Sequence, residues 1–255
     1  MHTRHRKILE MLQTDRLYIG PAARELGVSE MTLRRDLHEL EEQKLVMAVR
    51  GGAIMHPARY EPEQSAMRLT PEKFVLAEAL YDEIMPCERL FIGSGFTTLA
   101  FAKLLAMRRG ARITVVTNSL SAAAALFRTS HRVILLGGEL RNNSMDLIGP
   151  IAERNLTGFN IEWQVAGCDF ASPTAGFGTA DADLARFQQQ LTAAAAHTAI
   201  VTESVKFSSR PTNCFAAPYQ VDLLVTDTAL SGTKAAMLRN SGMKVMMRNI
   251  THAGL

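Results

Sequence analysis

Two arginines, two hydroxyl side chains and a histidine lie close together in the N-terminal part of the chain, at Ser29, Thr32, Arg34, Arg35 and His38. Arginine can form bidentate hydrogen bonds with guanine or with a phosphate, and serine and threonine can donate to phosphate oxygens. The 255-residue chain has a formal net charge of only +3, so the placement of these groups matters more than the average charge. Their chemistry is suited to contacts with the bases and backbone of duplex DNA.

A second basic feature follows a short distance along the chain. Arg50 precedes Gly51 and Gly52, between two apolar segments, 45–49 and 53–55, that we predict to be strands. Glycine allows the backbone to approach DNA closely, and an arginine at a hairpin tip can enter a minor groove. The predicted DNA-binding residues are Ser29, Thr32, Arg34, Arg35, His38, Arg50 and Gly51.

Short helices and this hairpin must position those side chains. The pattern predicts a helix over residues 3–13, a second over 20–26 and a third that Ser29 is placed to cap. Leu33, Leu37 and Leu40 share one face of the third helix, which leaves the arginines outside the buried stripe. Taken singly, such arginines are as typical of a solvated helix face, and the glycines of an ordinary turn. Together they predict a winged helix-turn-helix DNA-binding domain over residues 1–57.

Polar and glycine-rich residues in the remainder of the chain collect just after predicted strands. Residues 93–98 follow one strand and open a helix, whose free amides can hold a phosphate. Because the carboxyl ends of parallel strands meet at one edge of a sheet, these residues are expected to line a pocket for a small polar, anionic molecule. The predicted effector-binding residues are Gly93, Ser94, Gly95, Thr97, Thr98, Asn118, Ser119, Gly137, Gly138, Arg141 and Lys206.

The elements behind these residues are alternating apolar runs and helical segments. Short apolar runs that we predict to be strands occur at 90–92, 113–116, 133–136, 165–166, 199–201, 223–225 and 245–247. Alternation of this kind predicts an α/β domain with a mostly parallel, Rossmann-like sheet covered on both faces, over residues 74–255. Residues 57–73 hold three prolines, and we place a linker at 58–73.

Composition excludes several classes of protein. The chain is 47% hydrophobic and 21% charged, as expected for a globular protein, and no apolar run is long enough to suggest a membrane span or a secretory signal. Its three cysteines lie far apart, without the spacing of a metal site, which indicates reduced thiols in a cytoplasmic protein. We predict no cofactor, no metal and no catalytic residue.

Both halves of the chain resemble the DeoR family of bacterial transcriptional regulators. The N-terminal likeness rests on Val28, Ser29, Thr32, Leu33, Arg34, Arg35, Asp36, Leu37, Leu40, Glu41, Arg50, Gly51, Gly52 and Ala53. The segments GSGFTT, TNSL, GGELR and Lys206-Phe207 are similar to the family's sensor domain. The chain departs from the family at Gly93, where an acid is common, and at Glu203, where an aspartate is usual.

The resemblance implies a sensor domain related in fold to ribose-5-phosphate isomerase and glucosamine-6-phosphate deaminase. Such domains usually bind a phosphorylated sugar and assemble as dimers or larger homo-oligomers. By this likeness the effector residues to carry over are Gly95, Thr97, Thr98, Asn118, Gly137, Gly138 and Lys206. The expected partners are a double-stranded DNA operator, a phosphorylated metabolite and further copies of the chain.

Three functions remain open from the sequence. The first is a DNA-binding regulator, a repressor of a carbohydrate-metabolism operon, whose affinity for DNA responds to a sugar phosphate. The second is a sugar-phosphate isomerase or deaminase fused to a helix-turn-helix, but Gly93 removes one acid, and Glu139, Asp169, Glu203 and Asp227 show no spacing that pairs them as acid and base. The third is a DNA-binding protein whose second domain only oligomerises.

Overall fold

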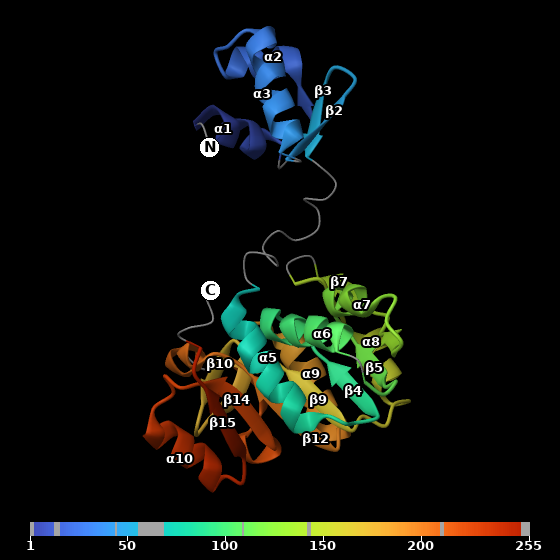
Figure 1. Cartoon of the computed structure of the whole chain (residues 1–255), viewed down its shortest axis with the longest axis vertical. Helices are drawn as coiled ribbons and strands as arrows, with labels where there is room; N and C mark the ends of the chain where they lie inside the picture. Colours follow the sequence, from blue (N-terminus) through green and yellow to red (C-terminus); the bar gives the residue numbers. More distant parts are fainter. Residues whose placement is uncertain are drawn as a thin grey trace. The chain divides into compact units, whose positions relative to one another are not determined.

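The computed structural model describes residues 3–12, 16–43, 45–55, 69–108, 110–141, 144–209 and 212–250. The chain divides into two compact units, Met1–Met67 and Arg68–Leu255 (Figure 1). Most of the predicted linker, residues 58–68, lies outside the described residues.

The N-terminal unit contains three helices and a small antiparallel sheet. Its elements are α1 (Thr3–Met11), β1 (Leu17–Tyr18), α2 (Ile19–Glu25), α3 (Glu30–Glu42), β2 (Val46–Val49) and β3 (Gly52–Met55). The strands lie in the order β1-β3-β2, with β2 and β3 forming the hairpin beside α3 (Figure 1). The predicted winged helix-turn-helix is confirmed.

Local chemistry explains where α3 begins and which face it buries. Gly27 has φ +67°, a left-handed conformation that suits glycine at the end of α2. Ser29 then caps α3, accepting a hydrogen bond from the backbone N–H of Thr32 at 3.1 Å. Leu33 and Leu40 of α3 are fully buried in the core of this unit, as the leucine spacing predicts.

The C-terminal unit is built on a seven-stranded parallel sheet in the order β15-β14-β12-β9-β4-β5-β6. The strands are β4 (Arg89–Ile92), β5 (Thr114–Thr117), β6 (Arg132–Leu135), β9 (Trp163–Ala166), β12 (His197–Val201), β14 (Leu223–Asp227) and β15 (Lys244–Arg248). Each contains or overlaps one of the seven apolar runs, so the parallel α/β sheet is confirmed.

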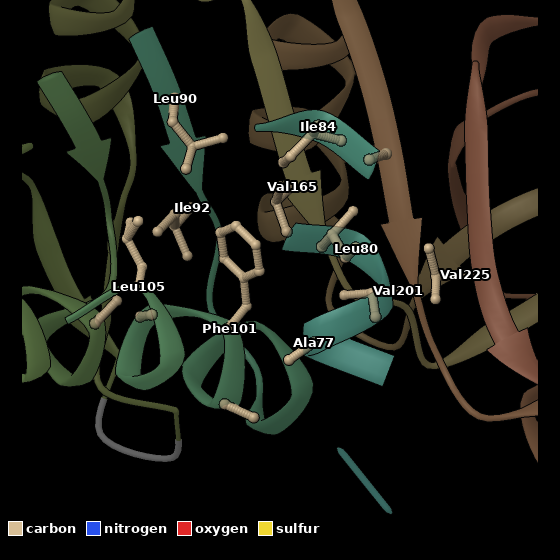
Figure 2. Close-up of a cluster of buried hydrophobic side chains, with 14 of the residues drawn as sticks. Ala77, Leu80, Ile84, Leu90, Ile92, Phe101, Leu105, Val165, Val201 and Val225 are labelled. Carbon is tan, nitrogen blue, oxygen red and sulfur yellow. The ribbon is translucent and has the colours of Figure 1, made fainter. Parts of the chain in front are cut away.

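Helices cover both faces of this sheet. Helices α5 (Pro71–Ile84), α6 (Phe96–Met107) and α7 (Leu120–Leu126) share one hydrophobic cluster with the strands, and α8 (Pro150–Leu156), α9 (Ala182–Ala194) and α10 (Gly232–Asn240) pack in the clusters on the opposite face. Leu90 and Ile92 of β4 face the first set, and Phe91 between them faces the second. In Figure 2, Phe101 of α6 and Leu80 of α5 lie against the strand side chains of this core.

Several smaller elements outside the main sheet were not predicted. They are the hairpin of β7 (Glu139–Arg141) and β8 (Asp146–Ile148), the antiparallel sheet of β10 (Phe170–Ser172), β11 (Gly176–Thr179) and β13 (Asn213–Ala216), and the 3-10 helices η2 (Ser204–Ser208) and η3 (Pro218–Gln220). The strands have only three or four residues each, too short for a clear apolar pattern.

Two boundaries differ from the sequence expectation. Helix α5 begins at Pro71, before the expected domain start at residue 74, because proline fits the first turn of a helix, where no N–H partner is needed. Helix α1 ends at Met11 rather than Gln13. In the part of the chain that the structure describes, no helix combines the length and apolar character needed to cross a bilayer.

Candidate DNA interface and effector site

The exposed face of α3 carries the predicted DNA-reading side chains. Arg34, Arg35 and His38 are all exposed, on the side of the helix away from the leucine stripe. Ser29 and Thr32 stand at its N-terminal end, with their hydroxyl oxygens 2.8 Å apart. The structure therefore brings these five residues onto one helix, with donors along the solvent side.

Each basic side chain on this face has an acidic neighbour one turn away. Arg34 lies 4.0 Å from Glu30, and Arg35 lies 3.9 Å from Glu39. His38 stands in the same relation to Glu42, at 3.7 Å. Exposed ion pairs at this spacing stabilise a helix by only about 0.3–0.5 kcal/mol. A phosphate or a base can therefore replace the glutamate with little loss of stability.

A buried carboxylate, Asp36, interrupts the apolar face of α3 and was missed as a functional position. Its side chain is 2% exposed and accepts two hydrogen bonds from the guanidinium of Arg4 in α1, at 2.5 and 2.8 Å. These bonds hold the pKa of Asp36 below its usual value, against desolvation, which raises it. The sequence did carry a signal for this position, because Asp36 is a charged residue beside Leu37 and one turn from Leu33, next to the buried stripe.

Asp36 also belongs to a group whose spacing would suit a metal ion. His5, Asp36 and Glu39 present ligand atoms within 4.8 Å of one another. Arg4 nevertheless donates to both oxygens of Asp36, which leaves that carboxylate poorly placed to ligate a cation. We therefore interpret the group as an ion-pair network that fastens α1 to α3.

The turn between β2 and β3 contains Arg50 and Gly51, the remaining predicted DNA contacts. Gly51 has φ +80°, which other residues rarely adopt, and no atom lies within 4 Å of the place a Cβ would occupy. Arg50 is exposed. The turn thus presents an exposed arginine next to a glycine, whose backbone no side chain of its own covers.

Several predicted effector residues meet around β8 at the carboxyl edge of the main sheet. The amide of Asn118 donates to the carbonyl of Leu147 at 3.2 Å, and Ser119 forms a bridge with Asp146. Gly138 approaches β8 so closely that a Cβ would lie 2.5 Å from the carbonyl of Ile148. Two loops that follow different strands are therefore joined through this one short strand.

Asp146 is the centre of this arrangement. It is fully buried and accepts hydrogen bonds from Ser94 at 2.6 Å, from Ser144 at 2.5 Å and from Arg141 at 2.7 and 2.8 Å. Arg141 also pairs with Asp181, the N-cap of α9, at 2.8 Å. Burial pushes the pKa of Arg141 down, but the two carboxylates outweigh burial and the pKa is raised.

The start of α6 offers backbone donors close to this centre. Gly95 is the N-cap residue, with φ +133°, and supplies no side-chain cap. The hydroxyl of Thr98 is turned back to the carbonyl of Gly95 at 2.9 Å. Gly93 is held in place by its N–H, which donates to the carbonyl of Val165 at 2.9 Å. The first turn of α6, which includes Thr97, therefore has the helix-dipole character that suits an anion.

Lys206 lies at the same edge, after β12, in η2. The described contacts do not join it to residues 93–98 or to Gly137. Its charge acts on Cys168, which follows β9: burial raises the pKa of that thiol to about 12, and Lys206 opposes the rise. The loop before η2 is anchored by Glu203, which pairs with Lys73 of α5 at 3.1 Å.

A winged helix-turn-helix with an exposed cationic helix, followed by a parallel-sheet unit with glycine loops at its carboxyl edge, defines a DNA-binding regulator with a separate sensor unit. Family models for the DeoR-like helix-turn-helix domain and the DeoR C terminal sensor domain match residues 4–57 and 69–228, respectively. The chain belongs to the DeoR family of transcriptional regulators, which confirms the resemblance seen in the sequence.

Two relatives with similar sequences agree with this assignment. The chain is 28% identical to the HTH-type transcriptional regulator GlpR of Haloferax volcanii over 247 residues, which is 95% of this chain and 96% of the relative. It is 28% identical to the glycerol-3-phosphate regulon repressor of Escherichia coli (strain K12) over 228 residues, 88% of this chain and 90% of the relative. A ribose 5-phosphate isomerase A from Methanocaldococcus jannaschii aligns over 53% of each chain, with 12% identity and a TM-score of 0.40.

Proposed function

We propose that this regulator represses genes of carbohydrate metabolism and that a phosphorylated sugar or a similar metabolite changes its affinity for DNA. The observation that carries the proposal is the combination of an exposed cationic α3 with an anion-suited first turn of α6 in a separate unit. The name of one relative, a glycerol-3-phosphate regulon repressor, supports a phosphorylated effector.

On the DNA side, we propose that α3 lies in a major groove. Arg34 and Arg35 then exchange their glutamates for guanine edges or phosphates, and Ser29 and Thr32 donate to phosphates near the helix start. His38 lies further along the same face. We propose that Arg50 reaches an adjacent minor groove while Gly51 lets the wing backbone approach.

On the sensor side, we propose that the phosphate binds at the first turn of α6. Gly95, Thr97 and Thr98 supply this turn, and Lys206, in η2 after β12, is the proposed cation. Asp146 and Asp181 already compensate the charge of Arg141, so Arg141 contacts the effector only by exchanging one of them. The remaining predicted residues, Gly93, Ser94, Asn118, Ser119, Gly137 and Gly138, shape the loops around the site.

Asn118 supports a polar ligand at this edge. Its side chain is 1% exposed, and within the described residues its Oδ1 has no hydrogen-bond partner, while its amide nitrogen is held by Leu147. A buried acceptor left unpaired is costly, and a hydroxyl donor of a sugar would satisfy it.

We propose that the sensor unit has no catalytic activity. Carboxylates at this edge serve as acceptors of hydrogen bonds within the protein: Asp169 from Thr179 and Ala180, and Asp227 from Ser204 and Ala229. A general base for isomerisation has to be available to a substrate proton, and these groups are occupied.

We further propose a division into a DNA-binding domain at 1–57, a linker that ends before α5 at Pro71 rather than at the expected residue 73, and a sensor and oligomerisation domain that begins with α5. Two half-sites on an operator require at least two copies of α3, so a homo-oligomer is the functional form. A regulator of this kind acts where the chromosome lies, in the cytoplasm.

The test is a panel of phosphorylated sugars, including glycerol 3-phosphate, added to the full-length protein while the fluorescence of Trp163 is followed during heating. An effector present at 100 times its dissociation constant stabilises the unit that binds it by about 2.7 kcal/mol. The same compound should change the affinity for a selected DNA duplex by about 5- to 150-fold. Stabilisation without a change in DNA affinity would contradict regulation, and conversion of an aldose phosphate into a ketose phosphate would establish the enzymatic alternative.

A further inference from the structure

The wing turn is held by the strand that precedes α2. A Cβ on Gly52 would lie 1.9 Å from the backbone oxygen of Leu17, so β1 and β3 meet at a distance that only glycine permits. Ile19 donates its backbone N–H to the carbonyl of Gly51 at 3.2 Å. The backbone of the turn is therefore fastened to residues 17–19.

Arg16 adds a side-chain contact to the same turn. Its guanidinium donates to the backbone carbonyl of Arg50, and its central carbon lies 5.0 Å from the centre of the Tyr18 ring. A planar guanidinium can stack on an aromatic face and donate a hydrogen bond at the same time. Tyr18 is 54% exposed, so this stack lies at the protein surface beside the wing.

We infer that Arg16 is a positioning residue for DNA binding, which fixes the wing turn so that the side chain of Arg50 is presented to DNA. The inference rests on the proposed contact between Arg50 and DNA. A turn that contains Gly51 and Gly52 has many accessible conformations, and ordering it at the moment of binding would lower the affinity. The hydrogen bond to the Arg50 carbonyl removes part of that freedom before DNA arrives.

The charge environment supports this division of roles. Arg34 and Arg35 each have a glutamate one turn away, whereas among the described residues no acidic side chain pairs with Arg50. Arg50 is therefore better prepared for a phosphate or a minor groove than Arg34 and Arg35 are. Arg16, by contrast, is half-buried and already bound to the protein.

The test is a double-mutant cycle on the full-length protein with Arg16→Met, Arg50→Ala and the two combined. The probe is the duplex that the wild-type protein selects from a random-sequence pool. We expect each single change to weaken binding by about tenfold, and the combination to bind no more weakly than Arg50→Ala alone. Arg112→Met removes an exposed cation from the sensor unit and should leave the affinity unchanged.

Three results would overturn the inference. Arg16→Met could bind like the wild type although Arg50→Ala binds weakly. The two effects could instead multiply, with Arg16→Met lowering the salt slope by about one in the Arg50→Ala background, which would make Arg16 a direct phosphate contact. Finally, if Arg50→Ala binds DNA as tightly as the wild type, Arg50 does not contact DNA, and Arg16 has no contact to position.

A second variant keeps the inference testable if Arg16→Met does not fold. Arg16→Lys keeps a cation for the Tyr18 ring and a donor for the Arg50 carbonyl but loses the planar guanidinium, so it should lose only part of the affinity that Arg16→Met loses. Hydrogen exchange in α1 and α3 reports whether either variant is unfolded. If Arg16→Met is unfolded, the affinity of Arg16→Lys for the selected duplex is the test. Binding by Arg16→Lys that is as weak as binding by Arg50→Ala would contradict the inference.

Discussion

At the scale of single residues, two buried carboxylates organise the two units. Asp36 ties α3 to α1 through Arg4, and Asp146 of β8 accepts hydrogen bonds from Arg141 and Ser144 of its own hairpin and from Ser94 of the loop after β4. In each case an arginine supplies two hydrogen bonds, which makes the contact directional as well as electrostatic. Asp36 and Asp146 are not among the residues predicted to touch DNA or effector, whereas Ser94 and Arg141, which bind Asp146, are predicted effector contacts.

Replacing Asp36 with asparagine should destabilise the N-terminal unit by about 2 kcal/mol, because Arg4 loses the charge that compensates it in a partly buried contact. Hydrogen exchange of α1 and α3 in the full-length protein measures the loss. Glu10→Gln is the control, since its pair with Arg6 is exposed at 3.9 Å and should matter by no more than about 0.5 kcal/mol. Equal protection in the two variants would contradict the role of Asp36.

The same contact predicts a pH dependence. The hydrogen bonds from Arg4 lower the pKa of Asp36 in the folded state, so its stabilising contribution is present above the unfolded pKa of about 3.9 and is lost as pH falls through the folded pKa. Protection of α1 and α3 should therefore decline in acid below about pH 4 more steeply in the wild type than in Asp36→Asn. Parallel acid profiles would show that another carboxylate is responsible.

Asp146→Asn should destabilise the sensor unit by about 3–5 kcal/mol, because a fully buried carboxylate is removed from a side-chain network that includes a largely buried arginine. Urea unfolding followed by Trp163, the single tryptophan of the chain, measures the change. Glu88→Gln is the control, because Glu88 is 84% exposed. If the Asp146 variant is as stable as this control, the buried network does not stabilise the site.

At the scale of elements, the capping of α3 links local structure to DNA binding. Ser29→Ala removes the acceptor for the Thr32 N–H and should cost about 1 kcal/mol of helix stability, together with a hydroxyl near the proposed phosphates. We expect faster hydrogen exchange at the start of α3 and weaker binding to the selected duplex. Ser231→Ala removes the matching cap of α10 in the other unit and should leave DNA binding unchanged, whereas an equal loss in both variants would contradict a local effect.

Elements with a clear pattern of apolar residues could be predicted from the sequence. The central strands of the main sheet are buried on both faces and all seven strands contain short apolar runs, and α3 shows its leucine stripe. The small sheet could not be predicted, because β11 is half glycine: a Cβ on Gly178 would lie 2.0 Å from the Phe170 ring. Its pairing depends on tertiary contact rather than on side-chain alternation.

The sites were predictable to the extent that their residues lie in local motifs. Arg34, Arg35 and the residues 93–98 follow from neighbouring residues in the chain. Asp36 with Arg4, Arg16 with Arg50, and Asp146 with Ser94 are contacts between distant positions, and a single sequence carries no signal for such pairs. These contacts only became visible once the fold had placed the partners together.

At the scale of the whole molecule, the division into two compact units predicts two separate unfolding transitions. Asp36→Asn should shift only the transition reported by hydrogen exchange in α3, and Asp146→Asn only the one reported by Trp163. If either substitution moves both transitions equally, the units unfold as one body, and the proposed separation of DNA reading from sensing loses its physical basis.

The most direct measurement of DNA recognition is selection of genomic fragments by the full-length protein, followed by affinity for the recovered duplex and for random duplex at the same salt concentration. We predict a preference of at least about a thousandfold for the recovered duplex, and a loss of that preference in the Arg34→Ala/Arg35→Ala variant with its folding intact. Equal affinity of the wild-type protein for recovered and random duplex, with and without phosphorylated sugars, would contradict a sequence-reading role for α3.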